Sequence, residues 1–192
     1  MAWFVPFVGY ALLYGAAGSL AIGGVLRLSG RNGLHLLPLL FTTLTFLALT
    51  QNPLPDRATM ICPIQSAEPQ LIPFDFLQTF AHLYRFDAPI LQWITNRTIA
   101  AAIMNVILCA VIGAALASHV ITWRRMMLFG VGLTLLVEFT QLTGAWGLYP
   151  CAWRKFDVDD LIMNVSGVII GWVWRRSLRP IMRSASINHQ NR

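Results

Sequence analysis

The chain has 192 residues, of which 56% are hydrophobic and only 11% are charged, and its formal net charge is +6. Soluble domains carry about 25% charged residues, so this composition excludes a typical soluble domain and favours a protein that crosses a membrane several times. No globular basic surface is available, so we expect no nucleic-acid partner. No Ser/Gly-rich linker, low-complexity run or repeat divides the chain, which predicts a single transmembrane domain over residues 1–192.

Five apolar blocks follow one another and predict helices at about 5–26, 34–51, 98–121, 126–145 and 160–176. The first, third and fourth reach the roughly 20 residues that a spanning helix needs, whereas the second and fifth are marginal and would tilt or thin the bilayer. Helices are expected because lipid offers the backbone no hydrogen-bond partner. The predicted fold class is therefore all-α, a bundle of about five transmembrane helices that contact the lipid bilayer.

Basic residues predict the orientation of this bundle. They gather between spans one and two, between spans three and four, and after span five, at Arg27, Arg31, Arg124, Arg125, Arg175, Arg176, Arg179, Arg183 and Arg192. These segments contain no acidic residue and would share one face, which the positive-inside rule makes cytoplasmic. We therefore expect the N-terminus outside, an outer loop over about 52–97, and a basic cytoplasmic tail over about 175–192.

The outer loop contains a stretch, residues 70–86, with the pattern of a short amphipathic helix. Apolar side chains recur there at three- and four-residue spacing, at Leu71, Phe74, Leu77, Phe80, Ala81 and Tyr84. Pro73 would suit the first turn of such a helix. Because the helix is too short to span, we expect it to pack within the loop, to lie along the outer interface of the membrane, or to cover the bundle as a lid.

Two of the three cysteines are expected in outer loops. An oxidising compartment would permit Cys62 and Cys151 to form a disulfide that ties the long loop to the segment before the fifth span, and the alternative is two free thiols. Cys109 is expected to pack within the third span. The two loop cysteines and His82 offer too few ligands for zinc, so we predict no metal site and no cofactor.

Polar side chains inside the apolar blocks are candidate functional residues. Glu138 lies within the fourth span, where an unpaired carboxylate is costly and is by default a functional hypothesis. Gln141 falls on the same helical face. Asn105 in the third span is a further candidate. Arg154 and Lys155 precede the acids of the fifth span and would neutralise part of their charge.

The start of the fifth span carries a matching polar face. At about 100° per residue, Asp157, Asp160 and Asn164 share one side of the helix, while Asp159 points elsewhere. One alternative is that Asp157 or Asp159 only caps the helix and complements its dipole. Another is that the buried polar residues form a purely structural hydrogen-bond network.

Below this polar face, Gly167 and Gly171 have the small-xxx-small spacing that lets another helix approach closely. We therefore expect the fourth and fifth spans to pack together. Glu138 on the fourth span would then lie near Asp160 on the fifth.

These residues stand in a sequence that resembles the VanZ-like family of membrane proteins. The resemblance rests on E-F-T-Q at 138–141, R-K-F-D-V-D-D-L-I-M-N at 154–164, G-x-x-x-G at 167–171, L-I-P-F at 71–74 and Asn105. It covers about residues 70–175, and the first two spans resemble the family only in hydrophobicity. Two departures stand out: Gln70 replaces the usual Asn before L-I-P-F, and Cys109-Ala-Val-Ile-Gly113 replaces the family's Phe-x-Pro-x-Gly.

The resemblance implies a multi-pass protein of the bacterial inner (plasma) membrane. Name-giving members of the family are associated with antibiotic resistance, namely low-level resistance to teicoplanin. No agreed reaction comes with the family.

Three functions fit these observations. The first is an outward-facing Glu/Asp/Asn site that binds or processes a cell-envelope molecule, such as a lipid-linked glycan or a glycopeptide-related compound. Glu138 and Asp160 would form an acid–base pair, and Asn164 and Gln141 would orient the ligand. Enzyme activity stays open, because the sequence offers no convincing nucleophile–base set.

The second function is a non-catalytic accessory subunit that docks other membrane-protein subunits through small-residue faces and charged loops. The third is proton or ion translocation through Glu138. It is less favoured, because the polar stripe stops in the outer half of the predicted membrane region.

Overall fold

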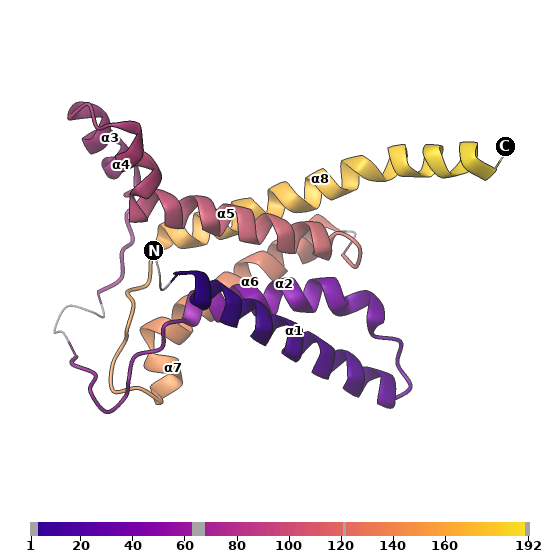
Figure 1. Cartoon of the computed structure of the whole chain (residues 1–192), viewed down its shortest axis with the longest axis horizontal. Coiled ribbons are helices and arrows are strands. Elements are labelled where there is room, and N and C mark those ends of the chain that lie inside the picture. The colour runs from indigo at the N-terminus through magenta and orange to yellow at the C-terminus, as the bar shows by residue number, and fades with distance from the viewer. Residues whose placement is uncertain (1–3, 63–67, 121, 191–192) are drawn as a thin grey trace.

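The computed structural model describes residues 4–62, 68–120 and 122–190, with side chains over 8–62, 68–120 and 122–178. All regular elements among these residues are helices and none is a strand, which confirms the all-α prediction. The elements in chain order are α1 (Phe4–Leu28), the 3-10 helix η1 (Leu34–Leu36), α2 (Leu37–Gln51), α3 (Leu77–Arg85), α4 (Ile90–Thr95), α5 (Arg97–Leu116), α6 (Trp123–Leu142), α7 (Gly144–Gly147) and α8 (Val158–Gln190) (Figure 1).

Four helical segments are long and apolar enough to cross a membrane: Val8–Leu28, Leu34–Gln51, Arg97–Leu116 and Trp123–Leu142. They coincide with the first four predicted spans. Their exposed apolar side chains, among them Leu13, Val25 and Leu128, are those that lipid would cover. The protein is therefore a multi-pass membrane protein. The predicted fifth span falls in α8, and its membrane crossing and the orientation of the bundle stay predictions.

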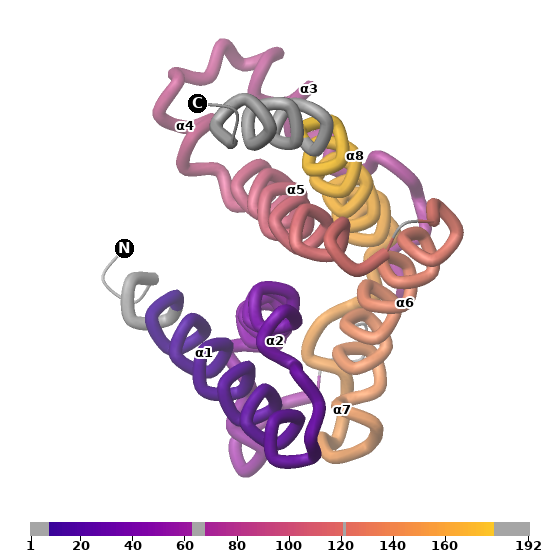
Figure 2. Tube along the Cα trace, turned by 90° about the vertical axis from the view of Figure 1, so that its right-hand side faces the viewer, coloured from indigo at the N-terminus to yellow at the C-terminus, as the bar shows by residue number. Residues whose placement is uncertain are grey.

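The three central helices share one core with α2. Figure 1 shows α5, α6 and α8 across the middle of the molecule, with α1 and α2 paired below them. α8 packs most extensively against α5, and α6 also packs against α8. Figure 2 shows α5 and α8 side by side, with α1 set apart from them. Phe46, Ile112, Leu116, Met126 and Val168, which come from all four helices, are buried where these elements meet.

The contact between α5 and α8, the α5–α8 seam, requires glycine. A Cβ on Gly171 would lie 1.8 Å from the carbonyl oxygen of Ala110, and a Cβ on Gly113 would lie 2.1 Å from that of Val168. Gly167 approaches the α5 backbone in the same way. The glycines of α8 thus allow the close approach that their spacing predicts, and the helix that meets them is α5. Small residues on α5 let the two backbones meet. The fourth and fifth predicted spans also pack together as expected, because α6 contacts α8 as well.

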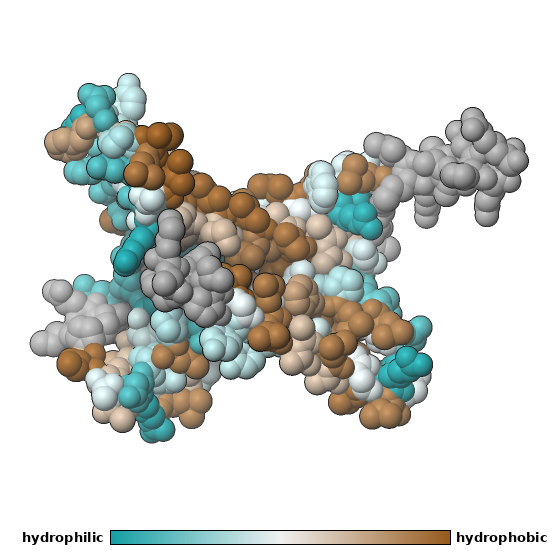
Figure 3. Space-filling view, in the orientation of Figure 1, coloured by the Kyte–Doolittle hydropathy of each residue, from teal (hydrophilic) through white to brown (hydrophobic). Residues whose placement is uncertain are grey.

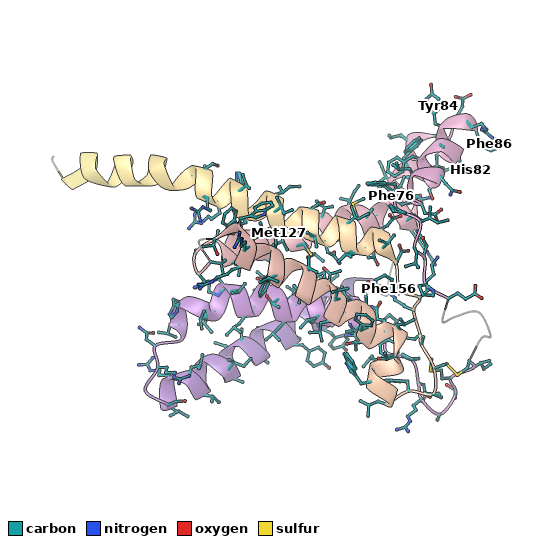
Figure 4. The ribbon with its side chains drawn as sticks, turned by 180° about the vertical axis from the view of Figure 1, so that it is seen from behind. Phe76, His82, Tyr84, Phe86, Met127 and Phe156 are labelled. Carbon is teal, nitrogen blue, oxygen red and sulfur yellow. A yellow bond between two sulfur atoms is a disulfide. The ribbon has the colours of Figure 1, made fainter. Side chains whose placement is uncertain are left out.

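The amphipathic helix expected over 70–86 is shorter in the structure, because α3 begins only at Leu77. Phe74 has a φ of +64°, a left-handed conformation that no right-handed helix contains. Pro73 therefore precedes the helix instead of occupying its first turn. The sequence did not predict α4, which together with α3 forms an arm that projects from the bundle (Figures 1 and 4).

Charge separates between two ends of the molecule. The loops after α1 and α5 and the far half of α8 lie at one end, the basic end, and α3, α4, α7 and the start of α8 lie at the other, the acidic end (Figure 1). Figure 3 shows mainly apolar surface between them. Within the predicted basic tail, the side chains of Arg179, Arg183 and Arg192 lie outside the described residues.

Candidate functional site

The start of α8 is held by two carboxylates. Asp157 is the residue before the helix, and its Oδ1 accepts a hydrogen bond of 2.9 Å from the backbone N–H of Asp159, as an N-cap does. Glu138 of α6 accepts the N–H of Asp157 itself through Oε2, also at 2.9 Å. Glu138 is 2% exposed, so this bond gives a buried carboxylate its partner. Glu138 therefore contacts the backbone of the residue that precedes α8.

Two polar residues further along α8, Asp160 and Asn164, face α5. Asn105 donates from Nδ2 to Oδ1 of Asp160 over 2.7 Å. One turn deeper, the Cys109 thiol donates to Oδ1 of Asn164 over 3.3 Å. These contacts lie in the α5–α8 seam, so Asn164 accepts its hydrogen bond from α5 and not from the α6 residues expected beside it. Cys109 was expected only to pack, and it also satisfies a buried amide oxygen.

Gln141 serves a different contact. Its Nε2 donates over 2.7 Å to the carbonyl oxygen of Thr50 in the last turn of α2. That oxygen is one of the carbonyls that a helix end leaves without an internal partner. Gln141 therefore links α6 to α2 through this bond, instead of donating it to Asp160 or Asn164.

Asp159 is the residue whose role the sequence did not reveal. Its carboxylate accepts the backbone N–H of Phe74 at 2.5 Å and that of Phe76 at 3.0 Å. The side chain is 6% exposed. The available signal was that Asp159 lies off the face shared by its neighbouring acids, so a different segment had to satisfy it. That segment is the L-I-P-F stretch before α3.

Backbone pairing completes the attachment of this stretch. Gln70 donates its N–H to the carbonyl oxygen of Phe156 at 2.8 Å and accepts the N–H of Val158 at 3.0 Å. The pairing is an isolated parallel bridge. The segment before α3 is thus fixed against the start of α8 by backbone and side-chain bonds together.

A partly open cavity of about 470 Å³ lies beside these contacts at the acidic end. It lies between the segment that begins α3, the start of α5 and the start of α8, near the position that Figure 4 labels Phe76. Its charged lining residues are Asp75, Lys155, Asp157, Asp159 and Asp160. Phe76, Ala101, Ala102 and Met163 give it an apolar wall. Glu138 and Asn105 stand behind this lining, each bonded to one of the lining residues.

The cavity is electronegative. Burial raises the pKa of the Asp157 carboxyl above its ordinary value, and the Asp159 carboxylate adds to the rise, while the N–H of Asp159 and the charge of Lys155 oppose it. Arg154 is exposed beside Lys155 and lies outside the lining. In the described part of the chain, no three His, Cys, Asp or Glu side chains are grouped to hold a metal ion.

A disulfide closes the loops at this end. Cys62 and Cys151 are bonded, with their Cα atoms 5.9 Å apart, as the sequence predicted (Figure 4). The turn before Cys151 requires Gly144, which has a φ of +61° and would bring a Cβ to 2.8 Å from the Cys151 carbonyl oxygen. The bond ties the loop after α2 to the segment that leads into α8.

Comparison with known proteins identifies the chain's family. A family model described as VanZ/LLP1 matches residues 36–179. Neither the comparison with curated proteins nor that with solved structures finds a match. The matched region contains every motif of the VanZ-like resemblance and also reaches back through α2, which had resembled the family only in hydrophobicity. The chain belongs to the VanZ/LLP1 family.

Proposed function

We propose that the acidic cavity binds the polar head of a cell-envelope molecule, a lipid-linked glycan or a glycopeptide-related compound, at the outer face of the bacterial inner membrane. The observation that carries this proposal is the cavity of about 470 Å³ that is lined by four aspartates and bordered by the segment just before α3. In this proposal α8 is the fifth span, the N-terminus lies outside and the C-terminus is cytoplasmic. The separation of acidic and basic ends supports that orientation.

The lining selects for ligand groups that donate hydrogen bonds. Carboxylates accept from sugar hydroxyls and from ammonium groups, and bonds to charged acceptors are stronger than neutral ones. A phosphate would be repelled by the aspartates, so the linker of a lipid-linked glycan is expected outside the cavity. Lys155 on the lining offers an anionic part of the ligand one favourable contact.

The contacts divide the candidate residues into two roles. Asp75 and Asp160 line the cavity and would contact the ligand. Glu138 and Asn105 would act through others, because Glu138 holds the Asp157 amide and Asn105 holds the Asp160 carboxylate. This division modifies the hypothesis that Glu138 and Asp160 act as a pair on the ligand, and we assign no reaction to the site.

Binding of a defined lipid tests this function. The full chain in nanodiscs would be titrated with a polyprenyl-diphosphate-linked glycan and with the same lipid lacking its glycan. Asp75→Asn and Asp160→Asn are each expected to weaken binding of the glycan-bearing lipid about tenfold, the effect of losing one hydrogen bond to a charged group. The lipid without the glycan should bind weakly to all forms of the protein.

Asp87→Asn is the matched control, because Asp87 lies in the loop after α3, outside the cavity lining, and asparagine tolerates its φ of +45°. Equal affinity of Asp160→Asn, Asp75→Asn and the control for the glycan-bearing lipid would refute the proposal. Melting curves of each variant would show that folding is intact.

The projecting arm favours a second candidate, the accessory subunit. Tyr84, Phe86 and Ile90 on this arm are 80%, 66% and 74% exposed, and Figure 4 shows Tyr84 and Phe86 at its tip. Exposed apolar groups of this kind mark surfaces that contact a membrane or another protein. A photo-crosslinking residue at Tyr84 should then capture one membrane protein in the native membrane, and capture should persist in Asp160→Asn. Crosslinks to lipid alone would contradict the subunit role.

Proton or ion translocation finds less support. Beyond Asn164, the α5–α8 seam is occupied by Gly167 and Gly171 pressed against the α5 backbone. A continuous polar path along this seam would need space that the backbone contact fills.

A further inference from the structure

A second cavity lies at the basic end, between η1 and the start of α2, the end of α5, and α8. Its volume is about 400 Å³. The rings of His35 and His119 lie on it with their centroids 5.4 Å apart. Ser118 and Arg175 line the same space. The cavity therefore gathers hydrogen-bond donors from three separate parts of the chain.

These donors suit an anion. An imidazole carries at least one N–H donor, and a guanidinium presents a planar fork that matches phosphate oxygens. Of the described residues that line this cavity, none is acidic. Four arginines at the same end, Arg27, Arg31, Arg124 and Arg125, add positive charge, and every acidic residue of the chain lies elsewhere. The potential at this cavity therefore attracts negative ligands.

The rest of the wall is apolar and open to the surface that lipid would cover. Val111 and Trp174 lie on it and are 49% and 59% exposed, and Ala114 and Ala115 continue the apolar surface along α5. A small inorganic anion would leave this wall exposed, whereas an acyl chain would cover it. Tryptophan is also enriched at the depth of lipid headgroups. The wall thus indicates a ligand that is both anionic and apolar.

We propose that this cavity binds an anionic phospholipid, with the phosphate between His35, His119 and Arg175 and an acyl chain along Val111 and Ala115. The site is independent of whatever occupies the acidic cavity. It requires only that α5 and α8 cross the bilayer with their basic ends at the level of the headgroups. One basic side chain near an anionic lipid surface contributes about 1 kcal/mol, or roughly fivefold in affinity.

Quenching of Trp174 fluorescence tests the site. The full chain would be placed in phosphatidylcholine vesicles that contain brominated phosphatidylglycerol or, at equal mole fraction, brominated phosphatidylcholine. The Trp174 signal is the difference in fluorescence between the wild type and Trp174→Phe. We expect brominated phosphatidylglycerol to quench the Trp174 signal more than brominated phosphatidylcholine does. The ratio of the two is the lipid preference, and Arg175→Gln should reduce it about fivefold. Equal quenching of the wild type by the two lipids would overturn the proposal.

Matched variants distinguish binding at a defined site from a general attraction of anionic lipid to surface charge. Arg124→Gln removes the same charge from an exposed position outside the cavity and should leave the preference within about twofold of the wild type, because exposed charges are screened. A loss as large as that of Arg175→Gln would contradict a defined site. His35→Leu with His119→Leu should lower the preference, whereas His35→Gln with His119→Gln should retain most of it, because glutamine keeps an N–H donor. Equal effects of the two pairs would also contradict the proposal.

Inorganic phosphate distinguishes a lipid from a free anion. Added at constant ionic strength, it should leave the preferential quenching of Trp174 unchanged. Displacement of the brominated lipid by phosphate would show a site for a free anion and would overturn the assignment to a phospholipid.

Discussion

The acidic and basic ends of this protein hold their charges in different ways. At the acidic end, Asp157, Asp159 and Asp160 each bond to a backbone N–H or a side-chain amide in the structure, and Glu138 is almost fully buried. At the basic end, Arg124 and Arg125 are exposed at the start of α6.

The difference follows from side-chain chemistry. A short carboxylate at the edge of an apolar bundle cannot reach water easily and must find donors within the protein. A long arginine side chain can extend its charge into water or among lipid headgroups. Acidic residues therefore determine the local structure here, whereas basic residues determine the orientation that we propose. Substitutions at the acidic end should consequently cost more stability than those at the basic end.

The largest effect is expected in the seam that connects the two ends. Gly171→Ala places a Cβ against the Ala110 carbonyl and must push α5 and α8 apart, at a cost of about 3 kcal/mol in the free energy of unfolding. Unfolding in mixed detergent micelles measures it. Gly132→Ala on α6 is the control, because a Cβ there meets nothing within 4 Å. A cost no larger than that of the control would show that the seam is not as close as described.

Loss of the Asp159 carboxylate should be the next largest effect. Asp159→Ala leaves the N–H groups of Phe74 and Phe76 without their acceptor, and we expect a loss of about 2 kcal/mol. Hydrogen exchange should accelerate at these two amides and change little in α2. Unchanged protection of the Phe74 and Phe76 amides would contradict the attachment of the L-I-P-F stretch.

The pH dependence of stability should show a smaller effect from Asp157. Its pKa is raised in the folded protein from an ordinary value of 3.8, so the folded state binds the proton more tightly than the unfolded state does. Stability contributed by this group is present at low pH and decreases as pH rises above that ordinary value. Asp157→Asn, which can still cap α8, should flatten this part of the profile. An identical slope in wild type and variant would refute the assignment.

The smallest effect is expected at the basic end. Replacing both Arg124 and Arg125 by glutamine should change the free energy of unfolding by no more than about 0.5 kcal/mol, because both side chains are exposed. The same double variant should increase the fraction of chains inserted in the opposite orientation, as reporter fusions at the C-terminus would measure. A large loss of stability with unchanged orientation would reverse the contrast between the two ends.

The sequence predicted the apolar helices from local pattern, and the disulfide from the topology that those helices imply. A run of apolar residues is sufficient to indicate a spanning helix, and two cysteines expected on one oxidising face are able to pair. The glycine spacing on α8 likewise indicated a close neighbour.

Partner choice was not predictable in the same way. The spacing of Gly167 and Gly171 indicates that some helix comes close. It does not choose the helix, because both α5 and α6 carry a small residue that faces α8, Gly113 and Gly130. Bonds from side chains to distant backbone leave no periodic signal. For that reason the contacts of Glu138 with the Asp157 amide and of Asp159 with the L-I-P-F stretch appear only in three dimensions.

The central claim is that the acidic cavity holds the head of a cell-envelope molecule. The most direct test is an experimental structure of the full chain determined with a polyprenyl-diphosphate-linked glycan. We predict density for the sugar among Asp75, Asp157 and Asp160, with the diphosphate outside the cavity. A cavity without sugar density at saturating glycan, or one filled by a side chain of a partner protein, would contradict the claim.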